Sequence, residues 1–397
     1  MRRHDVIAWV LGVTAYLRLS QAKTLSVLVA AALATPRISL AELGRHLTGP
    51  AAAKHRIKRT WRFTTNQRIE VATAMRGVVR RLTERRRKRP LVVAFDWTEV
   101  GGFCTLMAAA VMKGRAVPLL WVSIAKAQLK RRRNALEEKL LRQLVDMLPE
   151  GVSVLVLADR GFGRTELART CQDLRLHYLI RIKPDVWVET GGFRGKLRDF
   201  PVHKGMCRVL HDVAYRKHDP VRQHVVIRWV EGLPKKRDEP WFLMTDLARD
   251  PRSLSRLYGK RMTVEELFRD DKNRRNGWGL RDVQLSEAGR FDRLLLILAL
   301  AYLLLVGLGL RARRRYRAGM WCSSNDPDQC SVFTIGRTML DRMPTVRSFS
   351  LTLLGIRMRQ SHTSQVAAPR VRGGVSAPRS TATTGRVPAR CSRPHSR

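Results

Sequence analysis

The sequence predicts a mixed α/β fold on the basis of three observations. Apolar runs at 91–95, 103–112 and 116–122, joined by glycine-containing turns, have the composition of strands in antiparallel hairpins. The segment 135–148 has the apolar spacing of an amphipathic helix, and 152–158 is a second apolar run. Three meander strands, a helix and a returning parallel strand make a sheet that helices cover.

The first 90 residues have the spacing of helices. Over 40–47 apolar residues recur three and four positions apart, behind Ser39, whose hydroxyl suits a helix N-cap. Gly49 and Pro50 then interrupt the chain before a basic run at 54–62. Helix, turn and basic helix is the outline of a helix-turn-helix DNA-binding motif, although any small helical bundle shows the same outline. Its candidate DNA contacts are Lys54, Arg56 and Arg59.

The remaining elements follow from local composition. Short strands are expected at 178–182, 185–189, 225–230 and 241–245, and we interpret them as a β-rich insertion into the core. A helix is expected from 253 to about 272, and a very apolar helix from 294. Beyond Ser361 the chain is largely Arg, Ser, Thr, Pro and Gly, with seven Arg and no acid, and is expected to be disordered.

The net charge points to a polyanionic partner. The 397 residues include 76 Lys and Arg against 33 Asp and Glu, a net charge of +43, while a 44% hydrophobic content is enough for a real core. Such an excess favours nucleic acid, then an anionic membrane surface, over a small neutral metabolite. The ends are the most basic parts, with +16 in residues 1–90 and +9 in residues 320–397.

A cytoplasmic protein outside the membrane is expected. The six cysteines show no Cys-x-x-Cys pair and no zinc-type spacing with the histidines, so we interpret them as reduced thiols. Leu294 to Leu310 is an apolar run of 17 residues, just under the ~18 to 20 needed to span a bilayer, and we expect a buried core helix there. The apolar stretch 6–34 is interrupted by polar residues at the spacing of two amphipathic helices rather than a signal peptide.

Two acids end apolar runs. Asp96 follows the run at 91–95, and Asp159 follows the run at 152–158. Open α/β sheets bind their ligands at the carboxyl ends of strands, so the two side chains are candidates for chemistry. The alternative is helix capping, and Asp159 is placed to cap the helix after Gly161.

A third acid lies among cations on a predicted helix. At ~100° per residue, Tyr258, Arg261, Glu265 and Lys272 fall within one arc about 60° wide, from which the neighbouring acids are absent. The alternative is an ordinary i, i+4 ion pair between Arg261 and Glu265. Three carboxylates on two strands and a helix are what a two-metal phosphoryl-transfer site requires, with hard oxygen ligands for Mg²⁺ and cations for phosphates.

At these residues the chain resembles the DDE transposases of bacterial insertion sequences, of the group-four type. The Tyr-x2-Arg-x3-Glu-x6-Lys signature of that family is present with every spacing intact over 258–272. The first acid lies in Val-Val-Ala-Phe-Asp96-Trp-Thr and the second in Val-Leu-Ala-Asp159-Arg-Gly-Phe, both as the family writes them. The resemblance covers about residues 40–310.

The resemblance implies an RNase H-like catalytic domain and cut-and-paste transposition. Asp96, Asp159 and Glu265 would bind two Mg²⁺ ions, for which Mn²⁺ can substitute, and activate water and then a 3′-hydroxyl. Tyr258, Arg261 and Lys272 would hold phosphates near a flipped-out base. Trp241 matches the residue on which the family stacks that base, with core packing as the alternative for any single Trp. The implied partners are double-stranded DNA, as terminal inverted repeats and target, and a second copy in a homodimer.

The predicted organisation follows from the two lines of reasoning together. It comprises a helical DNA-binding domain at 1–88, the catalytic core at 89–176 and 249–319, the β-rich insertion at 177–248 and a basic, largely disordered tail at 320–397. Two departures stand out: Met262 replaces a frequent Trp after the signature Arg, and the tail has no family counterpart. Both favour the alternative of a catalytically decayed or domesticated DNA-binding relative, whereas the presence of all three acids argues against it.

Overall fold

The core of the protein is one ten-stranded sheet in the strand order β3-β2-β1-β4-β5-β10-β9-β8-β6-β7. The computed structural model describes residues 3–84, 90–112, 114–232, 239–275, 277–322 and 330–342. β1 (Leu91–Val100), β2 (Phe103–Met112) and β3 (Arg115–Ala125) form the expected antiparallel meander. β4 (Val154–Ala158) runs parallel to β1, and β5 (His177–Arg181) runs parallel to β4.

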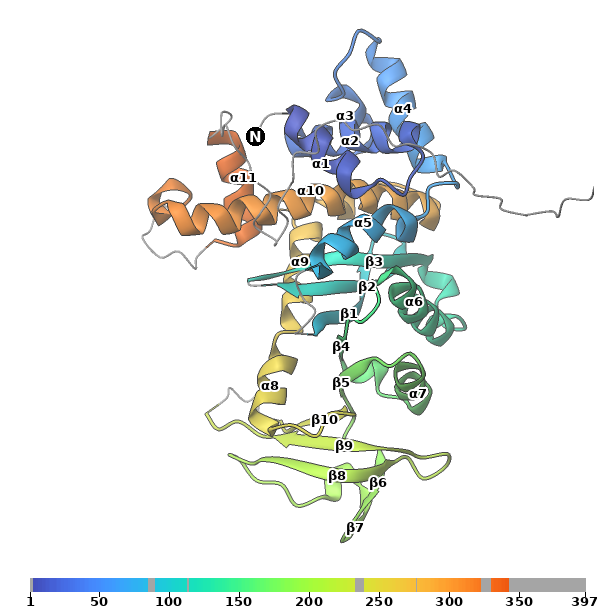
Figure 1. Ribbon diagram of the computed structural model, residues 1–397, viewed down its shortest axis with the longest axis vertical. Helices are drawn as coiled ribbons and strands as arrows, with labels where there is room; N and C mark the ends of the chain where they lie inside the picture. Colours follow the sequence, from blue (N-terminus) through green and yellow to red (C-terminus); the bar gives the residue numbers. More distant parts are fainter. Residues whose placement is uncertain are drawn as a thin grey trace, which may run out of the picture. The chain divides into compact units, whose positions relative to one another are not determined.

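Helices cover both faces of the sheet (Figure 1). α6 (Arg133–Met147) and α7 (Thr165–Asp173) lie on one side, and α8 (Pro251–Gly259) and α9 (Met262–Lys272) lie on the other. Most residues of β1, β2 and β3 are buried, which is why β2, β3 and the first half of β1 are continuous apolar runs rather than alternating ones. The mixed α/β prediction is confirmed, and the sheet flanked by helices agrees with an RNase H-like fold.

The β-rich insertion extends this same sheet. It contributes β6 (Trp187–Thr190), β7 (Phe193–Lys196), β8 (Cys207–Tyr215), β9 (Val221–Arg228) and β10 (Trp241–Thr245), all antiparallel. The strand at 177–181 pairs with β4 and so lies between the core and β10, which means that the inserted strands begin after it. β7 and β8 were not expected, because their half-exposed faces carry charged and polar residues instead of an apolar run.

The very apolar segment is a core helix, as predicted. α10 (Ala288–Arg315) has 28 residues, and 94% of its most apolar 18-residue window is buried within the protein. Among the described residues it is the one helix long and apolar enough to cross a bilayer. The five cysteines that the structure describes form no disulfide with one another.

A short helix lies within the segment 320–397, which was predicted to be a largely disordered tail. α11 (Val332–Arg342) packs against α10, and two glycines make that contact close. A Cβ at Gly309 would lie 1.8 Å from the Val332 carbonyl oxygen, and one at Gly336 would lie 2.0 Å from the Leu305 carbonyl oxygen. The segment beyond Ser361, expected to be disordered, lies outside the described residues.

The N-terminal segment is helical, as predicted. It comprises α1 (Arg3–Val13), α2 (Leu19–Ala34), α3 (Leu40–Arg45), α4 (Ala53–Thr65) and α5 (Val71–Thr83). The Ser39 hydroxyl accepts a hydrogen bond from the Glu42 N–H at 3.0 Å and so caps α3. A Cβ at Gly44 would lie 2.5 Å from the Ile57 Cα, so only glycine allows α3 and α4 to approach this closely. The exposed face of α4 carries Lys54, His55, Lys58, Arg59, Trp61 and Arg62.

Candidate active site

Asp96 and Asp159 lie next to each other on neighbouring parallel strands. The β1–β4 register pairs Phe95 with Ala158, so the next residue on each strand is one of the two acids. The expectation that Asp96 ends its strand is wrong, because β1 continues to Val100 and pairs Asp96 with Met107 of β2. A mid-strand position leaves Asp96 only 9% exposed, whereas Asp159 follows the end of β4 as predicted.

Asp159 also acts as a cap, the alternative raised for it. Its Oδ1 accepts a hydrogen bond from the Gly161 N–H at 2.8 Å, at the start of the short helical turn η2 (Arg160–Phe162). A carboxylate has about four lone-pair sites, so this single bond leaves the group able to bind a cation as well. Capping therefore orients the side chain without excluding a role in catalysis.

The signature residues belong to two helices instead of the single predicted helix. α8 ends at Gly259, a residue type that destabilises a helix interior relative to alanine, and α9 begins at Met262. Arg261 lies at the break and is 8% exposed. Its Nη1 donates to Asp96 Oδ2 at 2.8 Å and its Nη2 donates to Glu265 Oε1 at 2.6 Å. The i, i+4 ion pair is real, and the same guanidinium also joins the acid of α9 to the acid of β1.

Charge around Asp96 is incompletely balanced. Burial raises its pKa to about 6, Arg261 opposes that rise, and the nearby Asp159 and Glu265 carboxylates add to it. The Trp97 N–H donates to Asp96 Oδ1 at 2.9 Å and favours the ionised form. A buried carboxylate among two others, with the Arg261 guanidinium shared between Asp96 and Glu265, is an environment that a divalent cation would stabilise.

The three acids have the oxygen ligands that a divalent cation needs. In this structure, however, two of them bind the Arg261 guanidinium. Carboxylate oxygens are the hard ligands that Mg²⁺ and Mn²⁺ prefer. Among the described residues no group of three acid, His or Cys side chains is already set at metal-binding distances. Arg261 occupies the position between Asp96 and Glu265, so cation binding requires these side chains to rotate away from it.

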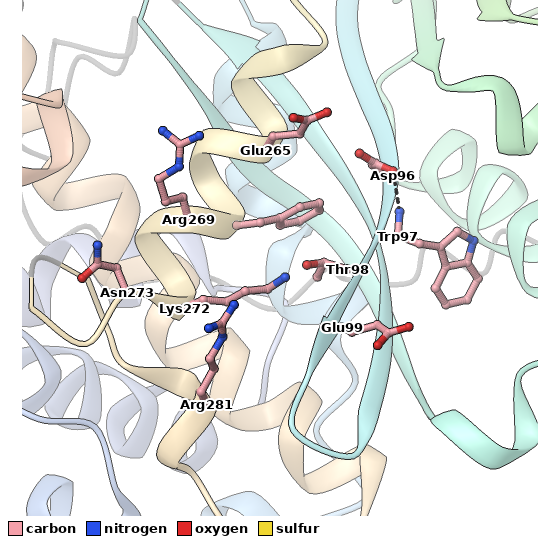
Figure 2. Close-up of a pocket in the computed structure, with 10 residues that line it drawn as sticks. Asp96, Trp97, Thr98, Glu99, Glu265, Arg269, Lys272, Asn273 and Arg281 are labelled. Atoms are coloured by element: carbon pink, nitrogen blue, oxygen red, sulfur yellow. Dashed lines mark hydrogen bonds between the residues drawn. The ribbon is translucent and has the colours of Figure 1, made fainter. Parts of the chain in front are cut away.

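A cavity of about 710 Å³ opens between β1 and α9 (Figure 2). Asp96 and Glu265 lie at one end, while Lys272 and Arg281 lie together at the other. Burial and the neighbouring Arg281 lower the pKa of Lys272. The remaining lining residues are Trp97, Thr98, Glu99, Phe268, Arg269 and Asn273. Acids beside cations in one cavity suit a phosphodiester whose scissile phosphate meets the acids and whose neighbouring phosphates meet the cations.

Trp241 and Tyr258 contact each other beside this site. Their ring centroids are 5.2 Å apart in an edge-to-face arrangement, and the Arg181 guanidinium lies 5.9 Å from the Trp241 centroid. Tyr258 is 5% exposed, and burial raises its pKa. Trp241 packs on the core as its alternative supposed, yet it is only half-buried, so part of the indole is accessible.

The three candidate DNA contacts of α4 lie in the N-terminal helices and not in the cavity. Lys54 and Arg59 are exposed, and Arg59 Nη2 donates to Thr24 Oγ1 at 3.2 Å. Arg56 is half-buried, and its Nη1 donates to the Leu47 carbonyl at 2.6 Å, which ties α4 to the end of α3. Lys54 is therefore the most available of the three for DNA.

Several functional candidates were missed at the sequence level. Thr98, Arg269 and Arg281 line the cavity, but their spacing to the acids carries no signal until the sheet and helices are assembled. Glu137 is 0% exposed on α6, and one signal could have found it. It belongs to the same helical stripe as Leu140, Leu141 and Leu144, where an acid is out of place.

The family model for the transposase DDE domain matches residues 87–304, more than half of the chain. The match begins just before β1, ends within α10 and includes Asp96, Asp159 and Glu265. This chain belongs to the DDE transposase family. It is therefore a DNA-binding transposase of a family that generally uses divalent metal ions. A search of curated proteins gave no match.

Proposed function

We propose that this DDE transposase moves an insertion sequence of the group-four type by a cut-and-paste route. It hydrolyses phosphodiester bonds at the terminal inverted repeats of the element and joins the freed 3′-hydroxyl to target DNA. The observation that carries the proposal is the bridging of Asp96 and Glu265 by one guanidinium, next to Asp159 and at the edge of a cavity with a cationic end.

In this mechanism Asp96, Asp159 and Glu265 would hold two Mg²⁺ ions, or Mn²⁺ in their place. The bound ions would polarise the scissile phosphate and lower the pKa of the attacking hydroxyl or water. Asp96 must be ionised for this task, and its raised pKa makes cation binding weaker in acid. Arg261, released from the acids, is then free to bind a DNA phosphate.

The rest of the site positions DNA. Lys272 and Arg281 hold phosphates beyond the scissile bond, so the strand lies along the cavity with its reactive phosphate at the acids. Tyr258 holds a phosphate near a flipped-out base, and the accessible part of Trp241 stacks on that base, which offsets the few kcal/mol that unstacking costs. The exposed basic face of α4 binds the terminal repeat. A homodimer holds both ends of the element. The protein acts in the cytoplasm, where bacterial DNA lies.

The test is cleavage of linear DNA that carries the element's own terminal repeats, with Mg²⁺ present. The wild-type protein is expected to cut at the repeat boundary, and Glu265→Gln is expected to bind the same DNA without cutting it. Glu266→Gln is the matched control, because Glu266 forms an ion pair with Arg115 instead of facing Asp96. Equal cutting by Glu265→Gln and Glu266→Gln would contradict the assignment of Glu265 as a catalytic acid.

A catalytically decayed DNA-binding relative is the second candidate. Met262, 49% exposed beside Arg261, stands where the family often has Trp, so one aromatic contact to the flipped base is missing. This candidate predicts that the wild-type protein binds repeat DNA but leaves it intact at any Mg²⁺ or Mn²⁺ concentration. Inverted repeats bracketing the gene would favour an active element instead.

A further inference from the structure

A buried acid lies on the opposite side of β1 from the cavity. Glu137, on the inward face of α6, is 0% exposed. Its Oε1 accepts hydrogen bonds from Trp97 Nε1 at 2.8 Å and from Arg133 Nε at 3.1 Å, and its Oε2 accepts one from Arg164 Nη1. Acids are almost never fully buried unless they are paired in this way. Two of the three donors connect Glu137 to the catalytic acids: Trp97 to Asp96, and Arg133 to Asp159.

The first connection runs through Trp97 to Asp96. Successive side chains of a strand point to opposite faces, so the Trp97 indole points away from the cavity while Asp96 faces it (Figure 2). The Trp97 backbone N–H donates to Asp96 Oδ1 at 2.9 Å. The peptide that orients the Asp96 carboxylate is thus attached to an indole that Glu137 holds in place.

The second connection runs through Arg133 to Asp159. The Arg133 guanidinium lies 5.8 Å from the ring centroid of Trp97 and 5.8 Å from that of Phe162. Phe162 belongs to η2, the turn whose Gly161 N–H donates to Asp159 Oδ1. A Cβ at Gly161 would lie 3.1 Å from Arg133 Nη2, so the Asp159 turn packs directly on the arginine that Glu137 binds.

We infer that Glu137 is a positioning residue that fixes the Asp96 and Asp159 carboxylates relative to each other, and thereby sets how tightly they hold the divalent cation. The inference rests on the proposed metal-dependent function. Groups that orient metal ligands typically change metal affinity or activity by about 10- to 100-fold when they are lost. Glu137 is placed to do so for two ligands at once.

Three variants separate positioning from general stability. Glu137→Gln keeps the size of the side chain but loses the charge, and its NH₂ group faces an arginine. Glu138→Gln is the matched control, because Glu138 accepts from the same Arg164, at 3.2 Å, on the next position of α6. Trp97→Phe removes the indole donor but keeps a ring under Arg133, and it leaves no buried charge unpaired.

The measurement is Mn²⁺ occupancy by electron paramagnetic resonance, on the full chain bound to terminal-repeat DNA. Glu137→Gln should need about 10- to 100-fold more Mn²⁺ for half occupancy than the wild type, and Glu138→Gln should match the wild type. Trp97→Phe should also weaken occupancy and add little in the Glu137→Gln background. DNA affinity and cooperative thermal unfolding should be retained, and cleavage should recover at high Mn²⁺.

Two results would overturn the inference while leaving the proposed function intact. One is equal Mn²⁺ occupancy in Glu137→Gln and Glu138→Gln. The other is a Glu137→Gln variant that loses DNA binding and cooperative unfolding, combined with wild-type occupancy in Trp97→Phe, since Glu137 would then be purely structural. A wild-type protein that neither binds Mn²⁺ nor cuts DNA would remove the proposed function and this inference with it.

Discussion

The fold brings Asp96 and Glu265 close together, and Arg261 reduces the repulsion between their carboxylates. It hydrogen-bonds Asp96 and Glu265, yet the pKa of Asp96 stays at about 6, because burial and the neighbouring carboxylates outweigh one guanidinium. Because the negative charge of the carboxylates is only partly compensated, the site can accept a cation. The same residue joins Asp96 to Glu265 in this structure, and in the proposed mechanism a cation would replace it and leave it available to DNA.

Asp271, beside Lys272, predicts a pH dependence of stability. Burial and the nearby Asp270 raise its pKa to about 8, above the ordinary 3.8. The folded state thus keeps a proton that the unfolded state releases, and between pH 4 and 8 this residue lowers the free energy of unfolding by about 1.4 kcal/mol per pH unit. Asp271→Asn should raise the melting temperature strongly at pH 8.5 and little at pH 4.

The matched control for this pH effect is Asp146→Asn, at an exposed position of α6. Thermal unfolding followed by circular dichroism at several pH values gives the readout. An Asp271→Asn gain that is the same at pH 4 and pH 8.5 would contradict the titration argument.

At the scale of elements, the break between α8 and α9 sets the functional geometry. A continuous helix would place all four signature residues on one face. The interruption at Lys260 and Arg261 lets Tyr258 contact Trp241 of β10 while Arg261 turns to the acids of β1 and α9. One short stretch of sequence thus serves two different contacts.

The α3–α4 contact predicts the result of a small substitution. Gly44→Ala would place a Cβ 2.5 Å from the Ile57 Cα, so the two helices must separate. We expect a loss of about 1–3 kcal/mol of stability, the usual cost of overpacking, and weaker repeat binding. Gly12→Ala is the control, because nothing lies within 4 Å of its Cβ and alanine is the better helix former.

Chemical denaturation and DNA-binding titrations of the two glycine variants check this prediction. Gly12→Ala should be neutral or slightly stabilising, by up to about 1 kcal/mol. Equal stability of the Gly44→Ala and Gly12→Ala variants would show that the α3–α4 contact is looser than the structure indicates.

At the scale of the whole molecule, one sheet joins the chemistry to the insertion. β10 pairs with β5 and β9, so the inserted strands continue the catalytic sheet and bring Trp241 beside α8. The net charge of +43 adds a long-range attraction for DNA that needs no particular sequence. In the proposed function, specific cutting would then come from the few groups in the cavity and from the basic face of α4.

The salt dependence of DNA binding tests that division. Lys54→Gln combined with Lys58→Gln, both on the exposed face of α4, should weaken repeat binding. The slope of log K against log salt should fall by about 0.9 for each phosphate that the double variant no longer neutralises. Arg142→Gln, at an exposed position of α6, is the control and should keep the wild-type slope. An unchanged slope in the double variant would exclude these lysines from the DNA interface.

The α/β class, the N-terminal helices, the buried α10 and all three acids follow from the amino-acid sequence alone. Apolar runs report burial directly, and the signature keeps its spacing along the chain. The sequence could not place Asp96 in mid-strand, because the polar second half of β1 gains its strand character from pairing with β2. It also missed β7 and β8, whose residues lack strong periodicity and fold through contacts with neighbours, and α11, which lies within the segment expected to be a tail.

What the acids face depends on tertiary structure. The linking of Asp96 to Glu265 through Arg261, the cationic end of the cavity, and the reach of Glu137 to Trp97 each join residues far apart in the chain. Local spacing says which face a side chain takes on its own helix or strand. Which faces meet is fixed by strand register and helix packing, so the sequence predicts the residues of the site while only the tertiary structure shows their geometry.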